Sequence, residues 1–205
     1  MISIVNYGIG NIGSVSNMLA HIGVKSSLAS SIDEIEQADV LLLPGVGNFG
    51  LAMQTLNKLG FVDPIRRKVL EERKPILGIC LGMQLLSRAS EEAEGVPGFG
   101  FIDADFVKFR PANAALKVPH MGWNTVSVRS PNPLLPQDGD EQRFYFVHSY
   151  YARCNNPSEV VATSVYDGEF VCAYGRDNVW GVQFHPEKSH KFGMKLLRNF
   201  AAYAC

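Results

Sequence analysis

A cysteine between two glycines is the residue of this chain best placed to act as a nucleophile. The segment Gly78-Ile-Cys-Leu-Gly82 follows a short apolar run and precedes a predicted helix that begins near Leu81. Glycines two residues on either side of Cys80 permit the tight strand-to-helix turn of a nucleophile elbow, with the side chain exposed on a strained backbone. Free N–H groups at the start of the helix favour ionisation of a thiol there. The alternative is a buried, inert cysteine, the commoner fate of a single thiol.

A histidine and a glutamate near the C-terminus supply the groups that such a thiol needs. In Gly181-Val-Gln-Phe-His-Pro-Glu-Lys188, a predicted strand ends before His185, and Glu187 follows two residues later. A thiolate needs an imidazole partner, and the imidazole needs an acceptor that fixes its tautomer. A single histidine at a strand end is more often an ordinary surface residue. Together with the cysteine turn, however, the pattern predicts a Cys80–His185–Glu187 triad.

Two glycine-rich loops lie near predicted strand ends. Pro44-Gly-Val-Gly-Asn-Phe-Gly50 offers backbone N–H groups at the carboxyl end of a strand, where open α/β proteins bind ligands. An oxyanion hole in an elbow enzyme needs the N–H of the residue after the nucleophile and one from a neighbouring loop, which indicates Leu81 with Val46 and Gly47. The alternative is a plain flexible loop.

The second glycine loop, Gly8-Ile-Gly-Asn-Ile-Gly13, matches the G-x-G-x-x-G pattern of dinucleotide sites. Such a site also needs an acidic residue at the end of the second strand. Asp33 instead falls in the first turn of a helix that Ser31 and Glu34 begin with a capping-box pattern. A tight surface turn is therefore the favoured interpretation, and a nucleotide site the lesser one.

The alternation of segments predicts an α/β fold with a doubly wound, mostly parallel sheet, helices on both faces and an antiparallel β extension. Strands are expected at 2–6, 24–28, 40–43 and 76–79, and helices at 11–22, from Ser31, from Asp63-Pro64 to about 73, and after Cys80. Short β-rich runs follow at 106–109, 123–128, 144–147, 160–165, 171–174 and 179–184, with turns at 130–133 and 137–140. An amphipathic helix at 190–203 closes what we expect to be a single domain, 1–205.

Composition excludes several classes of protein. A net charge of −1, from 19 basic and 20 acidic residues, argues against binding to nucleic acid or a membrane surface. The four cysteines lack paired spacing, and the histidines share no metal-ligand spacing. No apolar run approaches the roughly 20 residues of a membrane span. We expect a cytoplasmic protein with reduced thiols, no metal and no cofactor.

Six stretches together resemble a known family. Three are similar to class I, triad-type glutamine amidotransferases: Pro44-Gly-Val-Gly47, Gly78-Ile-Cys-Leu-Gly-Met-Gln84 and Gln183-Phe-His-Pro-Glu-Lys-Ser189. Three more resemble the glutaminase subunits of imidazole glycerol phosphate synthases: Asn6-Tyr-Gly-Ile-Gly-Asn11, Pro119-His-Met-Gly-Trp-Asn124 and Tyr145-Phe-Val-His-Ser-Tyr150. The resemblance covers the whole chain.

The resemblance implies that Cys80 attacks the side-chain amide of glutamine, that His185, oriented by Glu187, protonates the departing ammonia, and that water hydrolyses the thioester. The residues that it implies around the substrate are Gly45, Gly47, Gln84, Ser149 and Tyr150. A (β/α)₈-barrel synthase subunit would bind in a heterodimer at Asn6, Tyr7, Gly10, Asn11, Trp123 and Lys188. The barrel would use the ammonia to make imidazole glycerol phosphate and an aminoimidazole carboxamide ribonucleotide in histidine biosynthesis.

Two other interpretations stay open. The same glutaminase chemistry suits a related synthase in sugar or cell-surface biosynthesis. A chain of this fold can also be a catalytically silent assembly module.

Overall fold

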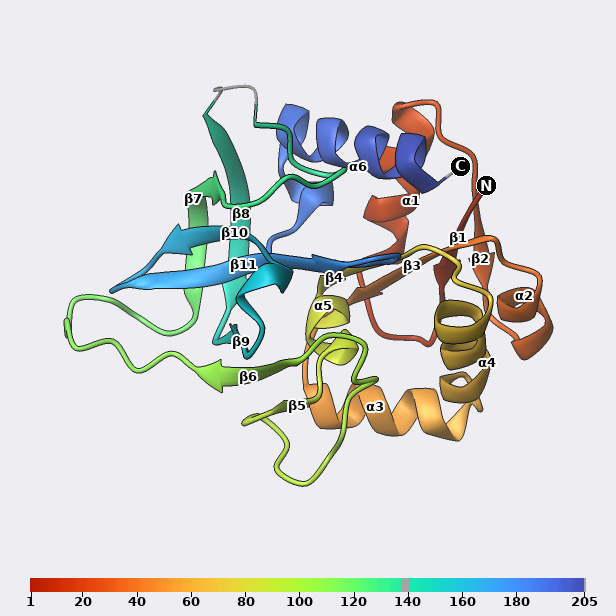
Figure 1. Cartoon of the computed structure of the whole chain (residues 1–205), viewed down its shortest axis with the longest axis horizontal. Coiled ribbons are helices and arrows are strands. Elements are labelled where there is room, and N and C mark those ends of the chain that lie inside the picture. The colour runs from red at the N-terminus through yellow and green to blue at the C-terminus, as the bar shows by residue number, and fades with distance from the viewer. Residues whose placement is uncertain (138–140, 205) are drawn as a thin grey trace.

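A single twisted sheet runs through the molecule (Figure 1). The computed structural model describes residues 1–137 and 141–204, and twelve strands of these residues form the sheet. Its parallel part has the order β2-β1-β3-β4-β12, with bounds Ser26–Ala29, Ile2–Val5, Val40–Gly45, Ile76–Cys80 and Val179–Val182. Consequently the carboxyl ends of β3, β4 and β12 meet at one edge.

The antiparallel part continues the same sheet beyond β12. Its main path runs β11 (Glu169–Arg176), β10 (Val160–Val165), β7 (His120–Val128) and β8 (Gln142–His148). Three further strands, β5 (Ala89–Ser90), β6 (Ala104–Lys108) and β9 (Tyr150–Cys154), lie off this path, and β9 pairs with β6 and β11. This arrangement, with helices on both faces, confirms the predicted fold class.

Helices cover both faces of the parallel part. Helices α1 (Ile12–His21) and α6 (His190–Ala204) lie together on one face, and α3 (Phe49–Lys58), α4 (Val62–Arg66) and α5 (Leu81–Leu86) on the other (Figure 1). Helix α2 (Ile32–Glu36), a π-helical turn (Arg67–Glu71) and 3₁₀ turns at Pro157–Glu159 and Pro186–Lys188 complete the elements.

Strand β3 is buried on both faces, which explains why its sequence is apolar throughout. Successive side chains of a strand point to opposite faces, so a strand covered on both sides needs no polar position. Leu41 and Leu43 belong to the core that contains Met53 of α3. Leu42 packs in the second core with Leu196 of α6.

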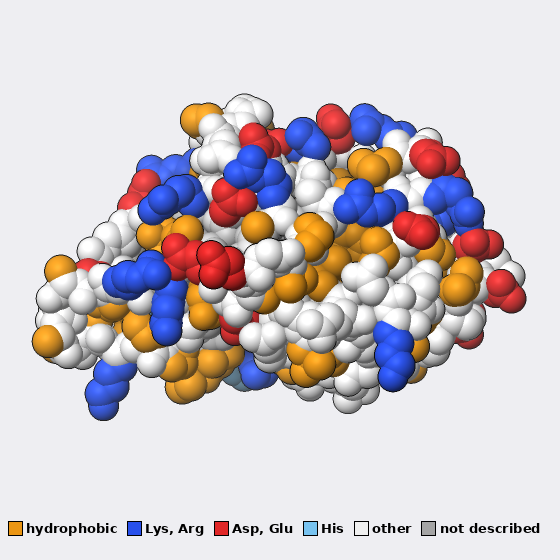
Figure 2. All heavy atoms as spheres, turned by 90° about the horizontal axis from the view of Figure 1, so that it is seen from below, with side chains coloured by type: hydrophobic (Ala, Val, Ile, Leu, Met, Phe, Trp, Pro, Cys, Tyr) orange, Lys and Arg blue, Asp and Glu red, His pale blue; other side chains and the backbone are white. Residues whose placement is uncertain are grey.

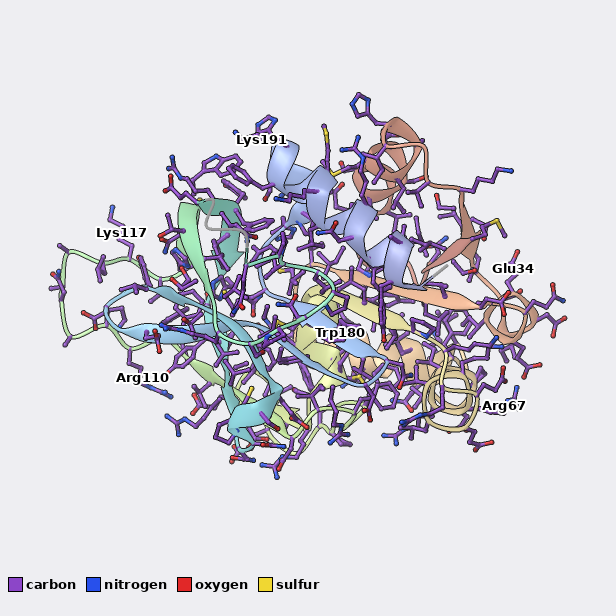
Figure 3. The ribbon with its side chains drawn as sticks, turned by 45° about the horizontal axis from the view of Figure 1, so that its top comes forward. Glu34, Arg67, Arg110, Lys117, Trp180 and Lys191 are labelled. Atoms are coloured by element: carbon purple, nitrogen blue, oxygen red, sulfur yellow. The ribbon has the colours of Figure 1, made fainter. Side chains whose placement is uncertain are left out.

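The outer surface carries mixed charge. On the face seen in Figure 2, acidic and basic side chains stand beside one another with apolar groups between them. In Figure 3, Glu34, Arg67 and Lys117 lie at the periphery, whereas Trp180 of β12 lies within the molecule. Among the described helices, none has the length and hydropathy to cross a membrane.

Several predicted boundaries were wrong. Helix α3 was missed because its N-cap, Asn48, lies inside the glycine-rich loop; the Asn48 side chain accepts a hydrogen bond from the Leu51 N–H. Helix α4 begins at Val62 after Phe61, so Asp63 is a first-turn residue and not the cap. Strand β2 begins two residues later than expected, and β5 and β9 were not predicted. Residues 138–140 of the predicted 137–140 turn lie outside the described residues, as does Cys205.

The close packing of backbone around the Cys80 turn explains why residues 78 and 82 are both glycine. Cys80 itself has φ of 54°. A Cβ on Gly82 would lie 1.8 Å from the Leu43 carbonyl oxygen, and one on Gly78 would lie 2.6 Å from the Gly82 carbonyl oxygen. Because the obstructing atoms are backbone, neither position has room for a side chain. The predicted elbow turn is therefore confirmed, and α5 lies directly against the end of β3. The expected exposure of its side chain was wrong: Cys80 is only 6% exposed, because it packs in the core that contains Leu77 and Val182.

We expect Gly82→Ala to destabilise the fold by roughly 3 kcal/mol, because overpacking against backbone forces β3 and α5 apart. At about 2–4 °C per kcal/mol for a chain of this size, the thermal unfolding midpoint should fall by roughly 10 °C. Gly13→Ala in α1 is the matched control, since nothing lies within 4 Å of a Cβ there. It should leave the midpoint unchanged or raise it slightly. Equal midpoints for the two variants would contradict the close approach.

Candidate active site

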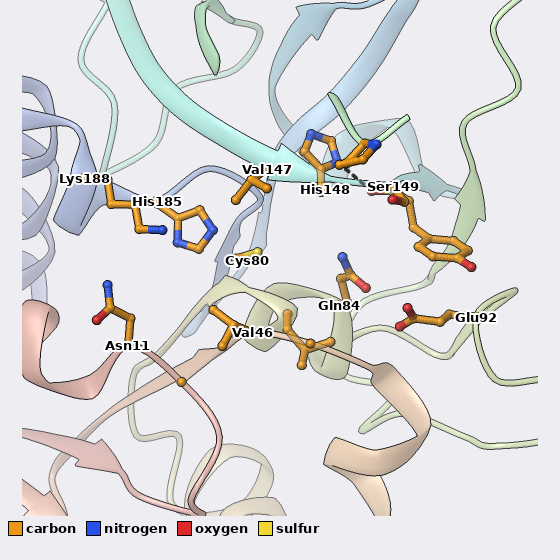
Figure 4. A pocket seen from close by; sticks show the side chains of 15 residues that line it. Asn11, Val46, Cys80, Gln84, Glu92, Val147, His148, Ser149, His185 and Lys188 are labelled. Carbon is orange, nitrogen blue, oxygen red and sulfur yellow. Dashed lines mark hydrogen bonds between the residues drawn. The ribbon is translucent and has the colours of Figure 1, made fainter. Parts of the chain in front are cut away.

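A cavity of about 730 Å³ opens at the carboxyl ends of β3, β4 and β12. Of the predicted catalytic, oxyanion and substrate residues, those that line it are Val46, Gly47, Cys80, Leu81, Gln84, Ser149, Tyr150 and His185. Figure 4 shows the labelled members of this set, Val46, Cys80, Gln84, Ser149 and His185, around one space. The sheet register accounts for the meeting, because β4 ends at Cys80 between β3 and β12.

His185 and Glu187 form a buried pair beside the thiol. His185 is the third residue after β12, and the Pro186–Lys188 turn brings Glu187 back, so that its Oε1 lies 2.8 Å from His185 Nδ1. Each side chain is only 1% exposed. The amide of Asn11 also donates to Glu187 Oε1, at 3.4 Å. Since Nδ1 is engaged, Nε2 is left without a hydrogen-bond partner among the described residues, and the ring faces Cys80 (Figure 4).

The surroundings of His185 favour its protonated form. Burial lowers the pKa of the imidazole, but the neighbouring Cys80 and Glu187 outweigh burial and raise the pKa of His185 to about 10. The imidazolium is therefore the resting form at neutral pH. A buried pair of histidines behaves in the opposite way: burial lowers the pKa of His120 to about 4 and that of His148 to about 3.

The far end of the cavity carries polar groups around Gln84. Gln84 is 5% exposed and lies one helical turn beyond Cys80. Ser149 and Tyr150 stand at the junction of β8 and β9, and Gly47 has φ of 101°, a conformation that favours glycine. Gly45 is not brought to the cavity. It ends β3, where a Cβ would lie 2.7 Å from the Tyr7 hydroxyl, so its role is close packing.

The residues expected to face a partner lie in three kinds of surroundings: the cavity, the exposed surface and, for Tyr7, the interior. Gly10, Asn11 and Lys188 line the cavity. Trp123 is 41% exposed and stacks on His190, with 5.6 Å between ring centroids, and Asn6 is partly exposed and donates to Ser30.

The prediction that Tyr7 contacts a partner is wrong. Its side chain is 2% exposed and its hydroxyl donates to the Pro44 carbonyl at 3.0 Å. Parallel pairing of β1 with β3 ends before Pro44, so the hydroxyl takes the place of a missing sheet partner.

Three residues of the site escaped the sequence reasoning. Glu92 lines the cavity, and its carboxylate accepts the Phe49 N–H at 2.7 Å. His148 lines it too and donates from Nδ1 to the Tyr150 carbonyl at 2.7 Å. Gln183 donates from Nε2 to Cys80 Sγ at 3.7 Å. No local pattern distinguishes Glu92, whereas His148 stands inside the Tyr145–Tyr150 motif and Gln183 inside the Gln183–Ser189 motif.

No metal centre is built into the described part of the chain. Histidine, cysteine, aspartate and glutamate side chains there form no group of three or more that could hold a metal ion. The arrangement instead suits nucleophilic chemistry: a thiol on a strained turn, a protonated imidazole beside it, and a carboxylate that orients the imidazole.

We expect His185 to stay protonated through neutral pH and to lose its proton near pH 10. Because this pKa exceeds the ordinary 6.5, folding favours the imidazolium. Its contribution to stability is complete below about pH 6.5 and is lost as pH rises through about 10. Glu187→Gln should lower the midpoint by removing the carboxylate charge. NMR titration of the imidazole nitrogens measures both, with His120 and His148 as neutral internal references. A wild-type midpoint near 6.5 would contradict the charge pairing.

Known proteins resemble the chain over its full length. The family model described as glutamine amidotransferase class-I matches residues 3–204. Imidazole glycerol phosphate synthase subunit HisH 2 of Methanococcus maripaludis is 48% identical over 204 residues, covering 100% of both chains. The protein of the same name from Pseudomonas aeruginosa is 50% identical over 200 residues, or 98% of each chain.

Solved structures agree on the fold. One described as a glutamine amidotransferase superposes with a TM-score of 0.78 at 19% identity, covering 99% of this chain and 98% of that one. PurLQS from Thermotoga maritima gives 0.71, also at 19% identity, covering 98% and 97%. With the sequence relatives, this confirms the resemblance: the chain belongs to the class I glutamine amidotransferases and, within them, to the family of HisH subunits of imidazole glycerol phosphate synthase.

Proposed function

We propose that Cys80 is the nucleophile of a glutaminase reaction in which His185 is acid and then base. The thiolate attacks the side-chain amide carbon of glutamine, and His185 gives its proton to the departing ammonia, leaving a thioester. Water then attacks the thioester while His185 accepts its proton, and glutamate leaves as the C–S bond breaks. The observation that carries this proposal is the cavity that joins a strained cysteine to a buried His185–Glu187 pair.

The tetrahedral intermediate carries a negative oxygen that needs donors. The Leu81 N–H at the start of α5 and an N–H of the Val46–Gly47 segment are the candidate donors. Both segments line the cavity with Cys80. Gly47 has a positive φ, a backbone conformation that residues other than glycine rarely adopt.

The amino-acid end of glutamine is expected to lie away from His185, near Gln84 and Glu92. In Figure 4 these two side chains stand together on the side of the cavity opposite Lys188. A carboxylate there suits the α-ammonium group of an amino acid. Ser149 and Tyr150 supply the remaining polar wall, and Gly45 packs against Leu81 beside the nucleophile.

The family relatives are named as synthase subunits, so we propose that this chain delivers ammonia to a (β/α)₈-barrel subunit in a cytoplasmic heterodimer. There the ammonia would enter imidazole glycerol phosphate and an aminoimidazole carboxamide ribonucleotide in histidine biosynthesis. Ammonia in neutral water is protonated and loses its nucleophilicity, so a direct transfer needs a docked partner. The rim formed by Gly10, Asn11 and Lys188, with exposed Met121 and Trp123 beside it on β7, suits this contact.

The names of the relatives favour this pathway over a related synthase in sugar or cell-surface biosynthesis. The assembled Cys80, His185 and Glu187 favour an enzyme over a silent assembly module.

We expect Cys80→Ala to abolish glutamine-dependent synthesis by the complex while ammonia-dependent synthesis continues, because the acceptor chemistry belongs to the partner. His185→Asn should be nearly as damaging, and Glu187→Gln milder, since an amide oxygen still orients the ring. Steady-state assays of the co-purified complex with saturating glutamine, or with ammonia, measure each effect.

Cys154→Ala is the matched control for this series, because Cys154 stands on β9 outside the cavity. It should keep both activities. Glutamine turnover in Cys80→Ala would refute the nucleophile, and loss of the ammonia-dependent reaction as well would mean that Cys80 is structural.

A further inference from the structure

Gln183 is a buried carboxamide that the mechanism above does not use. It follows the last residue of β12, and since Val182 pairs with Ile79, the register brings it beside Cys80. Its side chain is completely buried. One end donates from Nε2 to Cys80 Sγ at 3.7 Å, and the other end accepts from Gln84 Nε2 at 3.3 Å. A single amide therefore connects the nucleophile to a residue that lines the substrate cavity.

The chemistry of the neighbours decides which way each amide faces. With the proton on His185, the sulfur is an acceptor, so only the NH₂ end of Gln183 can face it. The Gln183 oxygen then faces Gln84 and requires a donor there, which the Gln84 NH₂ group supplies. The Gln84 oxygen remains for the cavity, and in Figure 4 it lies on the side of Glu92. The sulfur thus sets the orientation of Gln84 through Gln183.

The cavity wall consequently presents two acceptors together, the Gln84 oxygen and the Glu92 carboxylate. Two acceptors side by side repel an anion and bind a group with several N–H donors, such as an ammonium. If Gln84 were reversed, its NH₂ group would face the substrate ammonium and two donors would oppose each other.

We propose that Gln183 is a further catalytic residue of the glutaminase reaction, which donates a hydrogen bond to the Cys80 sulfur and holds Gln84 with its oxygen toward the substrate α-ammonium. This inference rests on the proposed function, since it takes Cys80 as the nucleophile and glutamine as the substrate. The bond to sulfur stabilises the attacking thiolate. It also stabilises the thiolate that leaves when water breaks the C–S bond of the thioester.

The test uses Gln183→Met, which keeps the length of the side chain but removes both hydrogen bonds, and Gln183→Glu, which places an acceptor beside the sulfur. The first readout is the rate at which iodoacetamide alkylates Cys80, followed by peptide mass spectrometry as a function of pH. The second is the ratio of kcat/KM for glutamine to that for glutaric acid monoamide, which is glutamine without its α-amino group. Both are measured on the complex.

We expect Gln183→Met to shift the midpoint of the alkylation profile upward by about one pH unit, a tenfold loss of thiolate below the midpoint. Gln183→Glu should shift it further. Gln183→Met should also reduce the preference for glutamine by about tenfold or more, because Gln84 is released. Gln183→Glu should retain most of that preference, because a carboxylate oxygen still accepts the hydrogen bond from Gln84. Gln84→Met should reduce the preference but leave the alkylation midpoint unchanged, since Gln84 does not donate to the sulfur.

Gln142→Met is the control for replacing a buried glutamine. Gln142 begins β8, its amide donates to the Pro136 carbonyl, and it does not line this cavity. It should match the wild type in both readouts. An unshifted midpoint and unchanged preference in Gln183→Met, while Cys80→Ala still abolishes glutamine turnover, would overturn this inference alone. Glutamine turnover in Cys80→Ala would instead overturn the proposed function. If Gln183→Met loses cooperative unfolding, Gln183→Glu decides, and a midpoint at or below that of the wild type overturns the inference.

Discussion

The close approach of α5 to the end of β3 is the constraint on which the site depends. The Leu43 carbonyl lies where a side chain of residue 82 would stand, so the helix can begin against the strand only with glycine there. This contact leaves Cys80 with a positive φ at the end of β4, where it lines the cavity although it is largely buried. A strained backbone of this kind persists only where its surroundings determine it fully. Here those surroundings are the two neighbouring strands and the first turn of α5.

The site also depends on the electrostatics of the buried His185–Glu187 pair. His185 and Glu187 are each almost fully buried, and a buried charge is stable only when it is paired and hydrogen-bonded. The pair shares one short hydrogen bond, and Cys80 supplies the second neighbour that favours the imidazolium. Burial instead keeps His120 and His148, which contact each other, in the neutral form. Identical side chains therefore receive opposite charge states, because His185 has Cys80 and Glu187 beside it whereas burial dominates at His120 and His148.

The sequence was informative where the chemistry depends on local order. The glycines around Cys80, the spacing of His185 and Glu187, and the continuous apolar run of β3 each reflect a constraint that acts within a few residues. Contacts between residues that are far apart in the sequence could not be predicted. Glu92 reaches the cavity from the segment after β5, and Tyr7 points inward although its loop reads as a surface turn. Helix α3 was missed for a related reason, since Asn48 reads as part of a loop until its bond to Leu51 is seen.

The central claim is that glutamine passes through a covalent bond to Cys80, and rapid acid quenching of the complex during turnover tests it most directly. Peptide mass spectrometry of the quenched chain should show a γ-glutamyl group on the peptide that contains Cys80, and on no other peptide. Glutamine turnover with no such adduct under conditions that make thioester hydrolysis rate-limiting, or an adduct on another residue, would contradict the account.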